Sequence, residues 1–356
     1  MRFAYLIGIG TFLLATEASA LQLTELDVGT QHACVVTDCG KIECWGGTAN
    51  GYGEAYDRYG DYVDVAVGQD HTCALANDGT VECWGDPSDG RLEPWFAAQG
   101  DFEQIDSFMD FTCGVVSGGD LECWGADAYG QSSSAFFLPG IYAEVVTGVD
   151  RACALTEDGD AIDCWGRGLS VFTERFEAQD ILPQANDAWA PERFVEIAVG
   201  YSHFCAVSDY SRLYCWGDNS FEQVSALNDG IAYAEEVFPG VYRHVGVVWK
   251  HVAAGYFGTC GSGRETNGSP IVQCWGYPYS NGPSYPVAPM DPDQLSVGFQ
   301  HACGLDRGND TVKCWGNNTS TVGTPHAAGL TDVPQMCGWE IYEPTLPPFK
   351  PVFPGW

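Results

Sequence analysis

The chain has 356 residues, with 48 aspartates and glutamates against 15 lysines and arginines, and a net charge of −33. This excess of negative charge excludes nucleic acid as a partner, because phosphates need a basic surface. It excludes an anionic membrane surface for the same reason. We expect a partner to be basic, or a cation, unless the acidity serves only to keep the protein soluble.

The first predicted element is a secretory signal peptide over residues 1–20. An arginine at the second position precedes a short apolar run, and Ala-Ser-Ala ends the segment, which is typical of a cleavage site. No later stretch reaches the roughly 20 apolar residues of a membrane-spanning helix. We therefore expect a soluble protein that is secreted or periplasmic, folded over residues 21–337 and followed by a proline-rich tail over 338–356.

Seven repeats follow, and each contains a cysteine pair whose second member begins Cys-Trp-Gly. The pairs are Cys34 and Cys44, Cys73 and Cys83, Cys113 and Cys123, Cys153 and Cys164, Cys205 and Cys215, Cys260 and Cys274, and Cys303 and Cys314. Exported proteins retain disulfides, whereas zinc knuckles need cysteines about two to four residues apart. The pairs are therefore predicted to be disulfides, with zinc as the rival interpretation.

Each pair is predicted to join the two strands of a β-hairpin. In the second repeat, a three-residue turn over Asn77-Asp78-Gly79, with its glycine in the left-handed conformation, places Cys73 directly opposite Cys83. One hairpin has Ser211 at the position of this glycine, and there the turn is strained. Each bridge closes a short loop and is worth roughly 2–3 kcal/mol by the chain-entropy estimate.

A further strand-like run precedes each hairpin. These runs are residues 23–29, 62–68, 102–108, 142–148, 194–200, 249–255 and 293–298. One such small sheet cannot bury its own faces, so the units must stack on one another. A repeat of about 40 residues with several strands is typical of propeller blades. The predicted fold is all-β, a seven-bladed β-propeller with one Cys-pair hairpin per blade, and an open solenoid is the alternative.

The repeats resemble those of a known family. His-Thr-Cys-Ala-Leu at 71–75, Asp-Gly-Thr-Val at 78–81 and Cys-Trp-Gly at 83–85 are similar to the repeats of the regulator of chromosome condensation family and of the secreted beta-lactamase inhibitor propellers. The resemblance covers about residues 23–316 and implies a propeller. It leaves the function open, because that fold hosts exchange factors, enzyme inhibitors and plain scaffolds.

Two further residue types recur along the repeats. The tryptophans are predicted to pack between blades, with a ring of stacking platforms for sugars or bases as the alternative: Trp45, Trp84, Trp124, Trp165, Trp216, Trp275 and Trp315. A histidine precedes the first cysteine at His32, His71, His203 and His301, and is replaced by Phe111, Arg151 and Gly258. We expect these histidines to hydrogen-bond to neighbouring loops rather than to share a metal, because each belongs to a different blade.

Motifs for catalysis are missing from the sequence. It contains no nucleophile elbow, zincin helix, phosphate loop or dinucleotide-binding turn, and its Asp-rich turns do not fit a calcium loop. We therefore predict no catalysis, no metal and no cofactor. Four glycosylation sequons have meaning only if the source glycosylates secreted proteins: Asn267, Asn309, Asn317 and Asn318.

Two insertions, over residues 166–193 and 218–249, interrupt the repeats. Insertions in repeat proteins form loops on one face, which is often the binding face. Their aromatic residues are candidate binding residues, or they pack down as small satellite clusters: Phe172, Phe176, Trp189, Phe221, Tyr233 and Phe238.

Two cysteines remain outside the repeat pattern. Cys39 lies at the tip of the first hairpin, and Cys337 follows the last Cys-Trp-Gly. Because the two ends of a propeller meet where the ring closes, we predict a Cys39–Cys337 bridge that locks it.

The sequence predicts a secreted, non-catalytic propeller that binds a protein or acts as a scaffold. One alternative is an extracellular enzyme inhibitor, which needs one face with aromatic anchors. The other is a carbohydrate-binding lectin, which needs equivalent exposed aromatic pockets in several blades.

Overall fold

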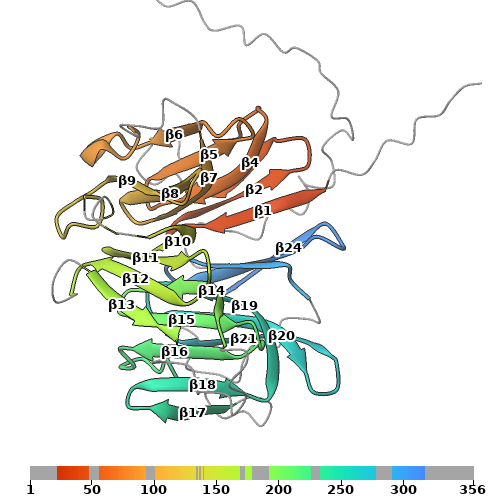
Figure 1. Cartoon of the computed structure of the whole chain (residues 1–356). Coiled ribbons are helices and arrows are strands. Elements are labelled where there is room, and N and C mark those ends of the chain that lie inside the picture. Colours follow the sequence, from red (N-terminus) through yellow and green to blue (C-terminus); the bar gives the residue numbers. More distant parts are fainter. Residues whose placement is uncertain are drawn as a thin grey trace, which may run out of the picture.

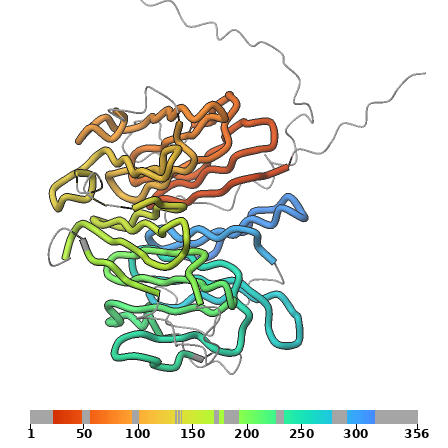
Figure 2. The backbone as a smooth tube through the Cα atoms, viewed as in Figure 1, coloured from red at the N-terminus to blue at the C-terminus, as the bar shows by residue number. Residues whose placement is uncertain are grey.

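Seven small antiparallel sheets follow one another around a ring, in chain order (Figure 1, Figure 2). The computed structural model describes residues 22–47, 56–93, 101–133, 135, 138, 140–168, 173–178, 192–225, 233–277 and 291–316. The predicted signal peptide and proline-rich tail lie outside these ranges. Within them, no helix is long and apolar enough to cross a membrane. The all-β, seven-bladed propeller is confirmed.

Each blade takes three consecutive strands from one stretch of chain. The first strands, which line the axis, are β1(Leu23–Val28), β4(Tyr62–Val67), β7(Phe102–Phe108), β10(Tyr142–Thr147), β14(Phe194–Val199), β19(Val247–Ala254) and β22(Gln294–Val297). The second strands are β2(His32–Thr37), β5(His71–Ala76), β8(Phe111–Val116), β11(Arg151–Thr156), β15(His203–Ser208), β20(Gly258–Glu265) and β23(His301–Asp306). The third strands are β3(Ile42–Gly46), β6(Val81–Gly85), β9(Leu121–Gly125), β12(Ala161–Gly166), β16(Leu213–Gly217), β21(Pro270–Gly276) and β24(Thr311–Gly316). A 3-10 turn, η1(Ser88–Gly90), follows β6.

The second and third strands of every blade form the predicted hairpin. In the second blade Cys73 lies opposite Cys83. Gly79 has a φ of +82°, and its N–H closes the turn by donating to the Ala76 carbonyl at 2.9 Å. Ser211 adopts the left-handed conformation with a φ of +57°, which carries a cost for a residue with a Cβ. The seven disulfides within blades are present as predicted.

The bridge predicted for the closure of the ring concerns Cys39 and Cys337. Cys39 is disulfide-bonded, and Cys337 lies outside the described residues. The Cys39–Cys337 bridge therefore stays a prediction.

Parts of both insertions are strands rather than the loops that the sequence predicts. β13(Thr173–Glu177) pairs with β12, and the hairpin of β17(Tyr233–Phe238) and β18(Val241–Val245) pairs through β18 with β16. The prediction is wrong for these segments because the third strand of a blade presents a row of unpaired backbone N–H and C=O groups at its outer edge. An inserted segment that follows this strand satisfies those groups by extending the sheet.

The hydrophobic core is divided into seven clusters, each formed between two neighbouring blades. One tryptophan of a Cys-Trp-Gly motif belongs to each cluster. Trp165, for example, is completely buried against Ala152 of its own blade and Phe111 of the preceding blade. The interpretation of the tryptophans as inter-blade packing is confirmed, because five are buried and only Trp45 and Trp315 are half-buried.

The ring closes between the last blade and the first by the same kind of packing. Strand β1 contacts β22 and β23, and Figure 1 shows the red first blade beside the blue last one. The Ser296 hydroxyl donates to Asp27 at 2.8 Å, and Arg307 pairs with Glu25 at 2.9 Å. No strand is exchanged among these described blades, so their closure depends on side chains.

Candidate functional site

The antiparallel strands give the propeller two different faces. The loop face carries the turns between first and second strands, and the segments that follow the third strands. The tip face carries the hairpin turns between second and third strands. Because all seven blades repeat this order, residues far apart in sequence meet on one face when they occupy the same repeat position.

Six aromatic side chains form a continuous cluster on the loop face of blades five to seven, here called the aromatic patch. Its members are Tyr201, Phe221, Tyr256, Phe257, Tyr277 and Phe299. Three of them are well exposed, Phe221 and Tyr277 at 41% and Phe299 at 37%.

Ring contacts run through the aromatic patch without a break. Tyr201 stacks on Tyr256 with ring centroids 4.8 Å apart, and Phe299 meets Tyr256 edge-on at 4.8 Å. Phe257 continues the chain to Phe221, at 4.5 Å. Each such pair contributes about 0.5–1.5 kcal/mol beyond the area that it buries, so the ring contacts hold the side chains of the patch in a defined arrangement.

Repeat geometry creates this patch. Tyr201, Tyr256 and Phe299 each follow the glycine that comes directly after a first strand, and Phe221 and Tyr277 follow third strands. The corresponding position after the first strand holds Thr30, Gln69, Met109 and Val149 in the other four blades. The aromatic residues are thus confined to three successive blades, and the sequence signal is an aromatic at one repeat position three times in a row.

A cation already lies at the border of the aromatic patch. The guanidinium of Arg167 lies 4.8 Å from the ring centre of Tyr129 and 5.9 Å from that of Tyr201. The same guanidinium pairs with Asp150 at 3.0 Å. The nearby charge of Asp150 also contributes, after burial and Tyr201, to the raised pKa of Tyr256. Acidic and aromatic side chains therefore meet at this border.

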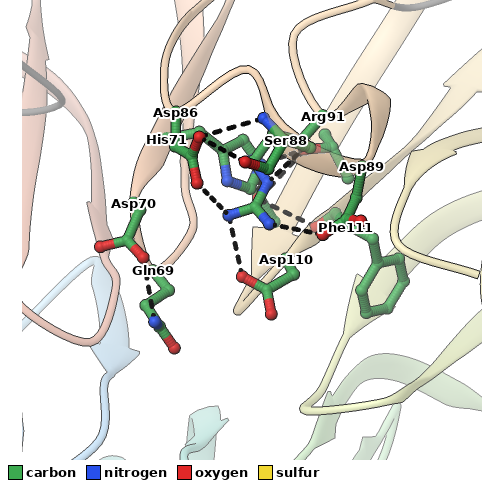
Figure 3. A network of polar contacts seen from close by, with 11 residues as sticks. Gln69, Asp70, His71, Asp86, Ser88, Asp89, Arg91, Asp110 and Phe111 are labelled. Carbon is green, nitrogen blue, oxygen red and sulfur yellow. Dashed lines mark hydrogen bonds and ion pairs between the residues drawn. The ribbon is translucent and has the colours of Figure 1, made fainter. Parts of the chain in front are cut away.

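An acidic region continues from there across blades two and three (Figure 3). The buried guanidinium of Arg91 pairs with Asp89 and Asp110, each at 3.0 Å, and with Asp86 at 3.5 Å. The outer carboxylates remain accessible, since the side chains of Asp89 and Asp110 are 60% and 39% exposed. Burial raises the pKa of Asp110, against the lowering effect of Arg91.

Three of the four repeated histidines join neighbouring blades by hydrogen bonds, whereas the buried Nε2 of His301 has no hydrogen-bond partner among the described residues. The Nε2 atoms of His32, His71 and His203 lie 2.7–2.9 Å from the hydroxyls of Thr72, Thr112 and Thr259, each on the next blade. Burial lowers the pKa of these imidazoles to about 3 or 4, so they are neutral. The partner is a threonine on a strand, not the neighbouring loop that the sequence predicts.

Where the histidine is replaced, its partner on the next blade changes too. Phe111 packs in one cluster with Ala152, and the Arg151 guanidinium lies 5.6 Å from the ring centre of Phe204. In the first pair two apolar side chains pack together, and in the second a cation lies over an aromatic ring. The sequence did not predict these pairs because their members are about 40 to 55 residues apart.

An acidic cavity of about 750 Å³ follows the propeller axis and reaches the tip face. Its wall includes the carboxylates of Glu25, Asp27, Glu103, Asp64, Asp106, Glu144, Glu196 and Asp293. Several accept hydrogen bonds from backbone N–H groups of the next blade, as Asp27 does from Val67 at 2.6 Å and Glu196 from Val252 at 2.9 Å. These carboxylates connect the blades, and no group of three or more metal-ligating side chains occurs among the described residues.

Burial raises the pKa of several axial carboxyls. The pKa of Asp27 rises to about 7, through burial first and then the charge of Asp106. Asp106 itself has a pKa of about 6, raised by burial. The pKa values of Asp64 and Glu144 are raised well above normal, first by burial and then by Glu25 and Glu196 respectively.

The three predicted binding residues whose side chains the structure describes do not form one site. Phe221 belongs to the aromatic patch. Phe176 packs in the core against Phe204 and Trp216, with centroids 5.7 and 5.3 Å apart, which fits the packing alternative. Phe238 is 40% exposed on the outer hairpin of the fifth blade. Phe172, Trp189 and the side chain of Tyr233 lie outside the described residues, as do the sequons at Asn317 and Asn318.

The repeats and the disulfide-stapled ring define the class of the protein as a β-propeller of short repeats. Three segments, residues 62–91, 194–223 and 293–321, match the family model for the regulator of chromosome condensation (RCC1) repeat. They correspond to blades two, five and seven. The chain is therefore an RCC1-like repeat propeller.

Solved structures support the fold. The ectodomain of the Arabidopsis thaliana receptor kinase ACR4 has a TM-score of 0.59 at 18% identity, over 86% of this chain and 99% of that one. The ectodomain of the Physcomitrella patens receptor kinase CR4 gives 0.57 at 20% identity, over 83% and 74%. Prp20p from Saccharomyces cerevisiae gives 0.56 at 17% identity, over 86% and 83%.

Proposed function

We propose that this protein is a secreted, non-catalytic propeller that binds another protein through the aromatic patch on its loop face. The patch carries the proposal. Soluble proteins seldom expose contiguous apolar surface unless it is used, and aromatic side chains supply a large share of the energy at protein interfaces. Here they are clustered in contact on one face.

Two further observations support the proposal. Seven disulfides are typical of proteins that work in an oxidising compartment. Among the similar propellers, Prp20p binds Gsp1p and histones, so a propeller of this kind can serve as a protein-binding surface.

One group of three hydrogen-bonded polar side chains, between blades two and three, has a structural role. His71, Ser107 and Thr112 are hydrogen-bonded to one another, but none is more than 3% exposed. A substrate cannot reach them, and their contacts connect two blades.

The test uses variants that remove exposed rings without touching the core. A partner is captured from the native extracellular fluid, identified by mass spectrometry and purified, and its Kd is measured by calorimetry. Replacing Phe221, Tyr277 and Phe299 together by serine should weaken binding at least about tenfold, because central aromatic contacts each contribute about 1–2 kcal/mol or more.

Tyr210→Ala is the matched control. Tyr210 is 46% exposed on the tip face, and the Arg212 guanidinium lies 5.4 Å from its ring centre, as Arg167 lies over Tyr129. The control should bind like the parent. If the triple variant also binds like the parent, the aromatic patch is not the interface and the proposal fails.

Inhibition of an extracellular enzyme is the second candidate function. The single observation in its favour is that the aromatic patch provides one face with aromatic anchors. The parent and the triple variant would be assayed against a panel of secreted hydrolases. Loss of inhibition only in the triple variant would support this candidate.

A further inference from the structure

Three features lie together on the loop face: the aromatic patch, the guanidinium of Arg167 at its border, and the exposed carboxylates beyond it. Building on the proposed protein-binding function, we infer that the partner presents an arginine or lysine beside an apolar side chain. The apolar side chain packs on the aromatic patch, and the cation is held between aromatic rings and carboxylates.

Arg167 demonstrates this mode of binding within the protein itself. Its guanidinium faces two tyrosine rings and pairs with Asp150, while 44% of its side chain remains exposed. A cation over an aromatic face is worth about 0.5–2 kcal/mol, more when water is excluded. A second cation from a partner would meet the same kinds of groups, because Tyr256 and Phe299 continue the aromatic surface next to Tyr201.

The negative charge of the loop face favours a partner with positive charge. Arg91 is nearly buried under three carboxylates and so presents little positive charge to a partner. Asp89 and Asp110 extend outward from this network and are available to a partner's cation. An acidic segment would be repelled by these groups and by the net charge of the chain, so a partner without basic residues fits this surface poorly.

The arrangement of the two regions also constrains the shape of the partner. The aromatic patch covers blades five to seven, and the acidic region begins at Asp150 of blade four and continues through Asp110 to Asp89. A segment that contacts both must run along several blades. An extended basic and apolar segment satisfies this geometry.

The experiment uses fluorescently labelled peptides of about ten residues and measures anisotropy at about 50 mM and about 300 mM NaCl. The probes alternate arginine with leucine, glutamine with leucine, or arginine with glycine. The Arg-Leu peptide should bind at least about tenfold more tightly than either of the others, and its affinity should fall at least about fivefold at the higher salt.

Two sets of variants locate the binding. Asp89→Asn, Asp110→Asn and Asp150→Asn together should weaken binding of the Arg-Leu peptide at least about fivefold and flatten its salt dependence. The matched control removes the same charge from the tip face through Asp38→Asn, Asp61→Asn and Asp120→Asn, all exposed, and should bind like the parent. Equal loss in both sets would mean attraction to the net charge alone and would overturn the inference.

The outcomes separate this inference from the proposed function. If the identified partner loses affinity with the serine triple variant but not with the aspartate variant, and is insensitive to salt, the patch binds protein and the basic partner is overturned. If the serine variant also binds the partner normally, the function itself fails. Binding of the Gln-Leu peptide as tightly as the Arg-Leu peptide likewise overturns the inference.

Discussion

Asp27 lies where the ring closes, and its substitution by asparagine should make the protein more stable at alkaline pH. The carboxylate of Asp27 accepts from the Val67 N–H on the second blade at 2.6 Å and from the Ser296 hydroxyl on the last blade at 2.8 Å. One side chain thus connects three blades. Its pKa of about 7, against an ordinary 3.8, means that ionisation at neutral pH opposes folding.

The magnitude follows from this shift. A difference of about three pKa units between the folded and unfolded chains corresponds to about 4 kcal/mol. Asp27 faces the axial cavity and is only partly shielded from solvent, which reduces the penalty, so we expect about 2 kcal/mol. Because the folded pKa is raised, the stability contribution is complete below the unfolded pKa and is lost as the pH rises through the folded pKa.

Asp27→Asn keeps an acceptor for Val67 and gains a donor toward Ser296, but it cannot ionise. Urea unfolding with intact disulfides should show the variant about 2 kcal/mol more stable than the parent at about pH 8, with the difference approaching zero near pH 4. Asp78→Asn is the control of opposite sign, because hydrogen bonds from Thr80 lower the pKa of the exposed Asp78. A difference for Asp27→Asn that does not vary with pH, or a variant less stable at pH 8, would refute the reasoning.

Three further predictions concern the joints between blades. Replacing both Cys39 and Cys337 by serine should lower the unfolding midpoint and expose the C-terminal segment to protease, with about 5 kcal/mol as the upper estimate for a loop of about 300 residues; unchanged melting and proteolysis would mean that closure needs only packing. Burial, and then Arg91, lowers the pKa of His71 in the folded protein to about 3, so between about pH 6 and 4 only the unfolded chain takes up a proton at this residue. His71→Gln should therefore reduce the loss of unfolding free energy on acidification by about 1.4 kcal/mol per pH unit in this range. An unchanged slope in urea unfolding would count against a neutral buried histidine. Arg151→His and Phe204→Thr should each destabilise, whereas the double variant should recreate the His–Thr pair with a coupling energy of at least about 1 kcal/mol; additive losses would contradict the pairing.

The number of blades and their hairpins could be predicted because they depend on local chemistry. A turn such as Asn77-Asp78-Gly79 fixes which residues face each other across two strands, so the seven disulfides follow from spacing. The inserted strands β13, β17 and β18 could not be predicted in this way. They form because the outer edge of each blade offers unpaired backbone groups, and that edge exists only after the blade has folded.

By itself, the sequence determined the repeat, the strand register within each blade and the acidic character of the protein, since each depends on residues close together in the chain. Only the tertiary structure decided which residues meet across blades. Tyr201, Tyr256 and Phe299 are separated by 55 and 43 positions, yet the ring brings their aromatic side chains into one patch. His32 contacts Thr72, and Arg151 contacts Phe204, for the same reason. Neighbouring blades place equivalent repeat positions side by side, although these positions are too far apart along the chain for a local sequence pattern to predict the contact.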